Sequence, residues 1–110
     1  MITQEMARQA VYDRINAPDP WWPKGQERPE MVIVRVEDHP LGWVFYYDSR
    51  PHHETGDFRY AIAGNAPFLV SRDDGTLWST GTRPPIEDRI LEAEKKLRAH
   101  LLNSNKLNPN

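Results

Sequence analysis

The sequence predicts an α+β domain, an antiparallel four- to five-stranded meander sheet with the N-terminal and C-terminal helices packed on one face. Two observations predict this fold. Apolar residues recur at three- and four-residue spacing near both ends of the chain, which is typical of surface helices. The middle holds segments rich in β-branched and aromatic residues, and the short turns between them allow neighbouring segments to pair as antiparallel hairpins.

The composition indicates one domain that is stabilised by packing. With 110 residues, 1–110 is expected to be a single domain, with a flexible tail at 103–110. Since there is no cysteine, disulfides, thiolate metal sites and thiol nucleophiles are excluded. The formal charge of −2 gives no overall attraction to nucleic acid, and neither a membrane span nor a leader pattern is found. We therefore expect a cytoplasmic protein that binds neither nucleic acid nor membranes.

The first helix is predicted between Thr3 and Asn16, with Thr3 as a cap and Ala17-Pro18 as its stop. Its apolar stripe comprises Met6, Ala10, Val11 and Ile15. The segment from 17 to 30 holds four prolines and one glycine, so it is predicted to be an extended loop. Trp21 and Trp22 in this loop allow two interpretations: they cover an edge of the sheet, or they anchor a protein partner.

The central strand is predicted from Gly42 to Tyr47, and the β-rich segment 31–37 is its hairpin partner across the turn at 38–40. Successive side chains of a strand point to opposite faces. Trp43, Phe45 and Tyr47 therefore share one face, which is expected to meet a helix. Val44, Tyr46 and Asp48 share the other.

Residues 48–57 are polar and are predicted to form a solvated loop that helps to shape a partner surface. His52, His53, Glu54 and Asp57 have side chains of metal-ligand type. Neighbouring residues on an irregular loop fix no coordination geometry, however, and no remote His or Cys group completes a set, so no metal and no cofactor are expected.

Three further elements are predicted in the second half of the chain. A strand at 58–62 is interrupted by Ala63-Gly64-Asn65-Ala66-Pro67, a bulge or close turn. The segments 68–72 and 77–80 flank Asp73-Asp74-Gly75-Thr76, a hairpin signal in which Gly75 takes the left-handed conformation. The last helix follows Pro85 and ends near Leu102, with Ile86, Ile90, Ala93, Leu97 and Leu101 as its apolar stripe. On its surface, Glu94 is expected to pair with Arg98.

The order and spacing of several motifs resemble those of a known bacterial family. These motifs are Val32-Ile33 leading into Gly42-Trp43-Val44-Phe45-Tyr46, then Ala63-Gly64-Asn65-Ala66-Pro67-Phe68-Leu69-Val70, then Arg72-Asp73-Asp74-Gly75 and Gly81-Thr82. The chain resembles the YrhB-like domain, also called the immunity protein 35 family, over about residues 31–97. The motif residues that carry the resemblance structurally are Gly42, Trp43, Phe45, Gly64, Asn65, Pro67 and Gly75.

The resemblance implies a small cytosolic protein that binds and neutralises a cognate toxin and does not catalyse a reaction. The sequence agrees, because no nucleophile with a base and no cofactor loop is found. The motif positions carry over as fold only. Candidate partner-binding residues come instead from the two polar loops: Trp21, Trp22, His52, His53, Glu54 and Asp57.

Two other functions are compatible with the sequence. One is a ligand pocket or minor enzyme site between sheet and helices, with Tyr46, Tyr60 and Trp78 among its lining residues. The other is a chaperone-like factor, which the heavily charged C-terminal helix favours. Either a monomer or a homodimer through an exposed sheet edge fits the sequence.

Overall fold

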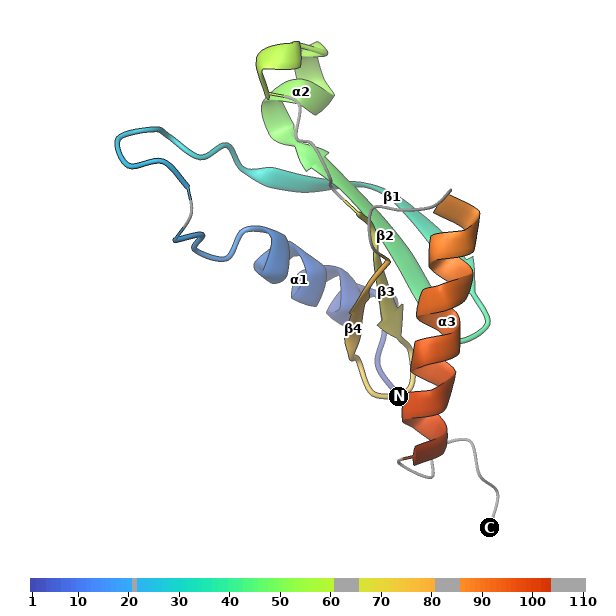
Figure 1. Cartoon of the computed structure of the whole chain (residues 1–110). Helices are drawn as coiled ribbons and strands as arrows, with labels where there is room; N and C mark the ends of the chain where they lie inside the picture. Colours follow the sequence, from blue (N-terminus) through green and yellow to red (C-terminus); the bar gives the residue numbers. More distant parts are fainter. Residues whose placement is uncertain (21, 61–65, 81–85, 104–110) are drawn as a thin grey trace.

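The computed structural model describes residues 1–20, 22–60, 66–80 and 86–103, although the side chains of Phe58 and Ile86 are not described. The fold is α+β, as predicted, with a four-stranded antiparallel sheet (Figure 1). The elements are α1 (Gln4–Ile15), β1 (Met31–His39), β2 (Gly42–Ser49), α2 (Arg50–Thr55), the 3-10 helix η1 (Phe58–Tyr60), β3 (Phe68–Ser71), β4 (Leu77–Ser79) and α3 (Ile86–Asn103).

The sheet is a meander in the order β1-β2-β3-β4, with every neighbouring pair antiparallel. β1 and β2 are the long strands, and β3 pairs with only the first half of β2, from Gly42 to Phe45. The second half of β2 extends beyond β3 and leads directly into α2 (Figure 1). The β1–β2 hairpin therefore has two ends of different character: a turn beside α3 and an open end at α2.

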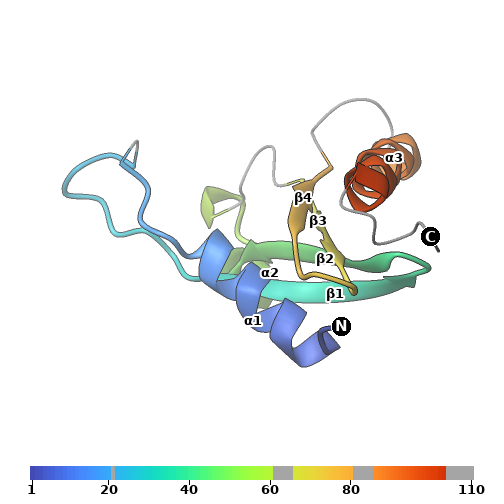
Figure 2. The same ribbon diagram turned by 90° about the horizontal axis from the view of Figure 1, so that it is seen from below.

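The two terminal helices lie on opposite faces of the sheet (Figure 2). This corrects the prediction that both pack on one face. The strands are apolar on both faces, with Trp43 and Phe45 on the α1 side and Val44 on the α3 side. Because each apolar face must be removed from water, each face takes one helix.

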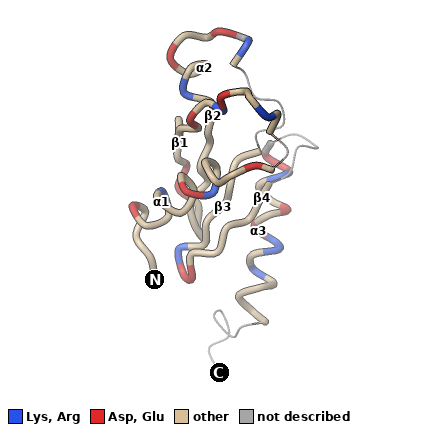
Figure 3. The backbone as a smooth tube through the Cα atoms, turned by 90° about the vertical axis from the view of Figure 1, so that its left-hand side faces the viewer, with Lys and Arg blue, Asp and Glu red and all other residues tan. Residues whose placement is uncertain are grey.

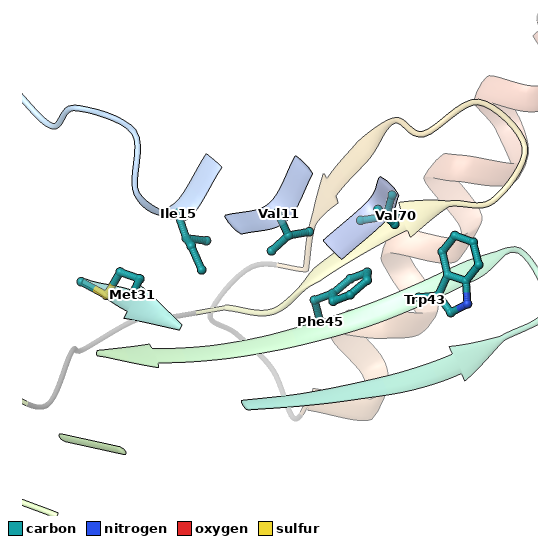
Figure 4. Packing of buried hydrophobic residues seen from close by; sticks show 7 residues of the cluster. Val11, Ile15, Met31, Trp43, Phe45 and Val70 are labelled. Carbon is teal, nitrogen blue, oxygen red and sulfur yellow. The ribbon is translucent and has the colours of Figure 1, made fainter. Parts of the chain in front are cut away.

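The α1 face holds an aromatic core (Figure 4), in which α1 buries Ala7, Val11 and Ile15 against the sheet. Thr3 caps the helix, as predicted, by accepting from the Met6 N–H at 3.1 Å. Met6 was expected in the buried stripe, but it is 56% exposed. The buried residues are four apart, and this places Met6 at the margin of the face that meets the sheet.

The polar segment after β2 is more ordered than predicted. Arg50–Thr55 forms the helix α2 in place of a loop, because the Ser49 hydroxyl accepts from the His52 N–H at 3.2 Å and Pro51 occupies the first turn. Gly56, with φ of +72°, ends it. The strand predicted at 58–62 begins instead as the 3-10 helix η1. Residues 61–65, with Gly64 and Asn65, and residues 104–110 of the predicted tail lie outside the described part of the chain.

Two motif glycines are required by the backbone geometry, and a motif proline contributes a backbone hydrogen bond. Gly42 lies at the start of β2 against β3, and a Cβ at this position would lie 1.9 Å from the carbonyl oxygen of Val70. Gly75 has φ of +76°, so the predicted left-handed residue of the β3–β4 hairpin is confirmed. Pro67 is buried, and its carbonyl accepts from the Thr80 N–H at 3.2 Å.

None of the helices in the described residues is long and apolar enough to span a lipid bilayer.

Candidate functional site

The proline-rich loop between α1 and β1 is closed at its base by side-chain hydrogen bonds. Asn16, directly after α1, accepts from the Met31 N–H at 2.8 Å and donates to the Met31 carbonyl at 2.9 Å. The Arg28 guanidinium donates to the carbonyls of Ala17 and Ile15, where a cation also suits the C-terminal end of a helix dipole. The two ends of the loop are thus held together, and the described loop residues, 17–20 and 22–30, project from a fixed base.

A charged cluster joins this loop to α1 and α2. The Glu30 carboxylate accepts from the Tyr12 hydroxyl at 2.5 Å and from the Arg50 Nε at 2.8 Å, and Arg50 also contacts Glu54 at 3.3 Å. The hydrogen bonds from Arg50 and Tyr12 lower the pKa of Glu30 to about 2. The bond to Glu30 raises the pKa of Tyr12. Glu30 is therefore an anion at neutral pH and orients α2 relative to the loop.

The loop and the segment after β2 together form a groove of about 530 Å³, which we call the Trp22 groove. Its lining residues are Trp22, Gln26, Glu27, Pro29, Pro51, Arg59 and Tyr60. The Trp22 indole N–H donates to the Gln26 carbonyl at 3.1 Å, which fixes the ring within the loop. The Arg59 guanidinium lies 5.8 Å from the centre of the Tyr60 ring. Rigid aromatic and proline surfaces beside charges of both signs are typical of a protein contact site.

The structure brings together some of the sequence-predicted site residues and separates others. Trp22 lines the groove, and Asp57 binds the lining residue Arg59 at 2.6 Å. His52 instead faces Asp48, with 2.6 Å between its Nδ1 and the carboxylate. His53 and Glu54 are exposed on α2, which carries one arginine, Arg50, and one acidic residue, Glu54 (Figure 3). Trp21 lies outside the described residues.

Six groove residues were not predicted as partner contacts: Gln26, Glu27 and Pro29 from the loop, and Pro51, Arg59 and Tyr60 from the segment after β2. Pro51 was assigned to a loop and Arg59-Tyr60 to a strand, so neither prediction placed them beside Trp22. The sequence did contain a signal for a partner contact: Arg59 and Tyr60 place a cation next to an aromatic ring just after a turn. Their approach to Trp22 depends on the path of the loop in space.

The aromatic residues proposed to line one ligand pocket do not share a cavity. Tyr60 belongs to the Trp22 groove and Tyr46 to a different groove beside α3. Trp78 packs against the α3 core and lies 5.4 Å from the His100 ring. Across the described ranges, no group of three or more His, Cys, Asp or Glu side chains is arranged to hold a metal ion.

Comparison with known proteins identifies the family. The model of the immunity protein 35 family matches residues 17–102, from the start of the proline-rich loop to the last turn of α3. The chain belongs to the immunity protein 35 family. It is also 42% identical over 66 residues to the uncharacterized protein YrhB of Escherichia coli (strain K12), a match that covers 60% of this chain and 70% of YrhB. No solved structure matches the chain.

The family match covers the whole Trp22 groove as well as the sheet. Helix α1 precedes the matched span, although it contributes Ala7, Val11 and Ile15 to the core. The immunity protein 35 region of this chain therefore includes the candidate surface in full and the sheet that supports it.

Proposed function

We propose that this member of the immunity protein 35 family acts in the cytoplasm as a non-enzymatic inhibitor that binds a cognate toxin protein and occludes it. The family name supports the immunity role. The partner is the toxin protein itself, because inhibition by occlusion requires that this chain cover the functional surface of the toxin. We assign this role to the Trp22 groove and the adjoining exposed side of α2.

The observation that carries this proposal is the meeting of two polar, aromatic segments in one groove. Trp22 from the loop and Tyr60 from η1 face the same space of about 530 Å³. Tryptophan and tyrosine dominate the binding energy of protein interfaces because they bury a large area at a small cost in side-chain entropy. Charged residues at the margin, such as Glu27 and Arg59, would steer the partner and fix its register.

The first test is growth rescue. The product of the open reading frame next to this one is expressed in a sensitive strain, with and without this chain. We expect growth arrest from the neighbour alone and full growth when the chain is present. Continued arrest in the presence of the folded chain would contradict the proposal.

The groove is tested by Trp22→Ala, with Lys24→Ala on the same loop as the matched control. The loss of an aromatic anchor at the centre of an interface costs about 2 kcal/mol or more, so the Kd for the neighbouring gene product should rise about 30-fold. Lys24→Ala should bind like the wild type, since its side chain is exposed and does not line the groove. Calorimetry measures the affinity. A lower melting temperature for Trp22→Ala would indicate that the ring stabilises the fold by covering the sheet, and that it is not a partner anchor.

A further inference from the structure

A second groove of about 790 Å³ lies at the other end of the β1–β2 hairpin, between its turn and α3. We call it the hairpin-turn groove. Its lining residues are Arg35, Glu37, Asp38, His39, Tyr46, Glu87, Ile90, Leu91 and Glu94. Figure 1 shows α3 running beside this turn, away from α2. The groove is therefore separate from the Trp22 groove.

The hairpin-turn groove is negatively charged. Four carboxylates and one guanidinium line it. Its histidine, His39, lies between Glu37 and Glu94, at 3.7 and 3.5 Å. Burial, a hydrogen bond to Glu37 and the charges of Glu37 and Glu87 together raise the pKa of Tyr46 to about 12. The negative field of the carboxylates thus reaches the tyrosine of the groove.

The groove also exposes apolar surface. Leu91 is 55% exposed, and the next residue towards the core, Ile90, is buried. Both line the groove together with the Tyr46 ring. An exposed leucine beside an aromatic ring and carboxylates lets one long side chain of a partner make an apolar contact with its stem and a charge contact with its head group.

Arg35 shows how a cation is held in this place. Its guanidinium lies 5.0 Å from the centre of the Tyr46 ring and forms an ion pair with Glu37, which also accepts from the Tyr46 hydroxyl at 2.7 Å. Ring and carboxylate thus bind one guanidinium together. On the α3 side of the same groove, Glu87 is exposed and a Glu94 carboxylate oxygen lies 3.5 Å from the His39 ring.

We propose that the hairpin-turn groove docks a cationic segment of the partner protein, with arginine or lysine side chains against Glu87 and Glu94 and an apolar side chain on Leu91. Charge complementarity selects this occupant, because a negative groove with an exposed leucine repels nucleic acid and acidic peptides. The identity of the partner as the toxin rests on the proposed function, whereas the chemistry of the groove does not. The groove adds a second contact at the far end of the hairpin and speeds association.

The test uses a defined probe, a soluble decapeptide with four arginines and two leucines, titrated into the isotopically labelled full chain. We expect amide shifts at the β1–β2 turn and in the first half of α3. The Kd should rise at least 10-fold between 50 and 500 mM NaCl, because salt shortens the screening length from about 14 Å to about 4 Å. A peptide with glutamate in place of arginine should not bind. Shifts elsewhere, or the absence of binding, would overturn the proposal.

Two matched pairs of variants locate the contact. Glu87→Lys should weaken peptide binding about 10-fold, whereas Asp88→Lys makes the same charge change in the same helical turn outside the groove and should weaken it less than 3-fold. Leu91→Ala should weaken it about 5-fold, and Leu102→Ala, an exposed leucine on the same helix, should not. Equal effects within either pair would contradict a defined groove.

Failure of this inference differs from failure of the proposed function. The peptide titration contains no toxin, so its outcome stands whether or not the chain rescues growth. If the wild type rescues growth and Glu87→Lys rescues equally with unchanged association rate, the groove does not contact the toxin and the proposal is overturned. If Glu87→Lys slows association about 10-fold while Asp88→Lys does not, the groove is part of the toxin interface.

Discussion

The two faces of the sheet are closed by helices in different ways. On the α1 face the core is aromatic, with Trp43 and Phe45 from β2 beneath α1. On the α3 face it is aliphatic, and Val44 and Leu69 meet leucines of α3. One strand, β2, supplies both cores through alternate residues. The sheet is therefore the shared element, and each helix depends on it separately.

The polar attachments of the two helices also differ. α1 is held by groups that do not titrate near neutral pH: the Thr3 cap, the Asn16 amide at Met31, and the Ile2 N–H, which donates to the Arg72 carbonyl at 3.0 Å. α3 is joined to the sheet by two histidine–carboxylate contacts, His39 with Glu94 and His100 with Asp74 at 3.0 Å. The two helices are therefore attached by different chemistry: backbone, hydroxyl and amide groups at α1, and histidine–carboxylate contacts at α3.

The largest effect is expected for Gly42→Ala, which should damage both faces at once. The added Cβ would lie 1.9 Å from the Val70 carbonyl oxygen, so β2 and β3 must separate and both cores lose their support. We expect a loss on the order of 4 kcal/mol in the free energy of unfolding, measured by urea denaturation. Gly56→Ala is the control: its φ is +72°, which disfavours a Cβ, but no atom lies within 4 Å of the added Cβ, so only about 1 kcal/mol should be lost.

A smaller effect is expected for Asp74→Asn, which should act on the α3 side alone. Burial raises the pKa of Asp74, but hydrogen bonds from Thr76 and His100 outweigh it and lower the pKa to about 2. Because the pKa is below its unfolded value of about 3.9, the carboxylate stabilises the fold above pH 4, and this contribution is lost as the pH falls through 2.

Wild type and Asp74→Asn should therefore differ by about 1 to 2 kcal/mol at pH 7 and converge near pH 2. Urea denaturation at a series of pH values measures the difference. Asp13→Asn, which removes an exposed carboxylate from α1, serves as the control. A constant difference at all pH values would show that the ionised form of Asp74 contributes nothing.

The smallest effect is expected for Ile→Val substitutions, which compare the stability of the two cores directly. Ile15 on the α1 face is 6% exposed and Ile90 on the α3 face is 7% exposed, so Ile→Val makes the same change in both cores. Each variant should lose about 1 kcal/mol of unfolding free energy. The double variant should lose their sum to within about 0.5 kcal/mol, because the sites lie on opposite faces. Strong non-additivity would mean that the two cores act as one.

The candidate site could be predicted only in part. Trp22 and Asp57 were predicted as partner contacts from their residue types, and the structure places Trp22 in the groove and Asp57 on the lining residue Arg59. The groove itself requires Pro51 and Tyr60 to lie beside Trp22. In the chain, each of them is about 30 residues or more from Trp22. No local pattern determines that approach. It follows from the Asn16–Met31 contacts and from Arg50 binding Glu30.

The sequence by itself determined the features that depend on neighbouring residues. The alternation of β2, the Thr3 cap and the left-handed Gly75 follow from side-chain direction, a single hydrogen bond and the lack of a Cβ. Only the tertiary structure decided which face each helix takes and that Glu94 contacts His39 and not the expected Arg98. Those outcomes depend on contacts between residues far apart in the chain, and the free energy of burying both apolar faces selects among them.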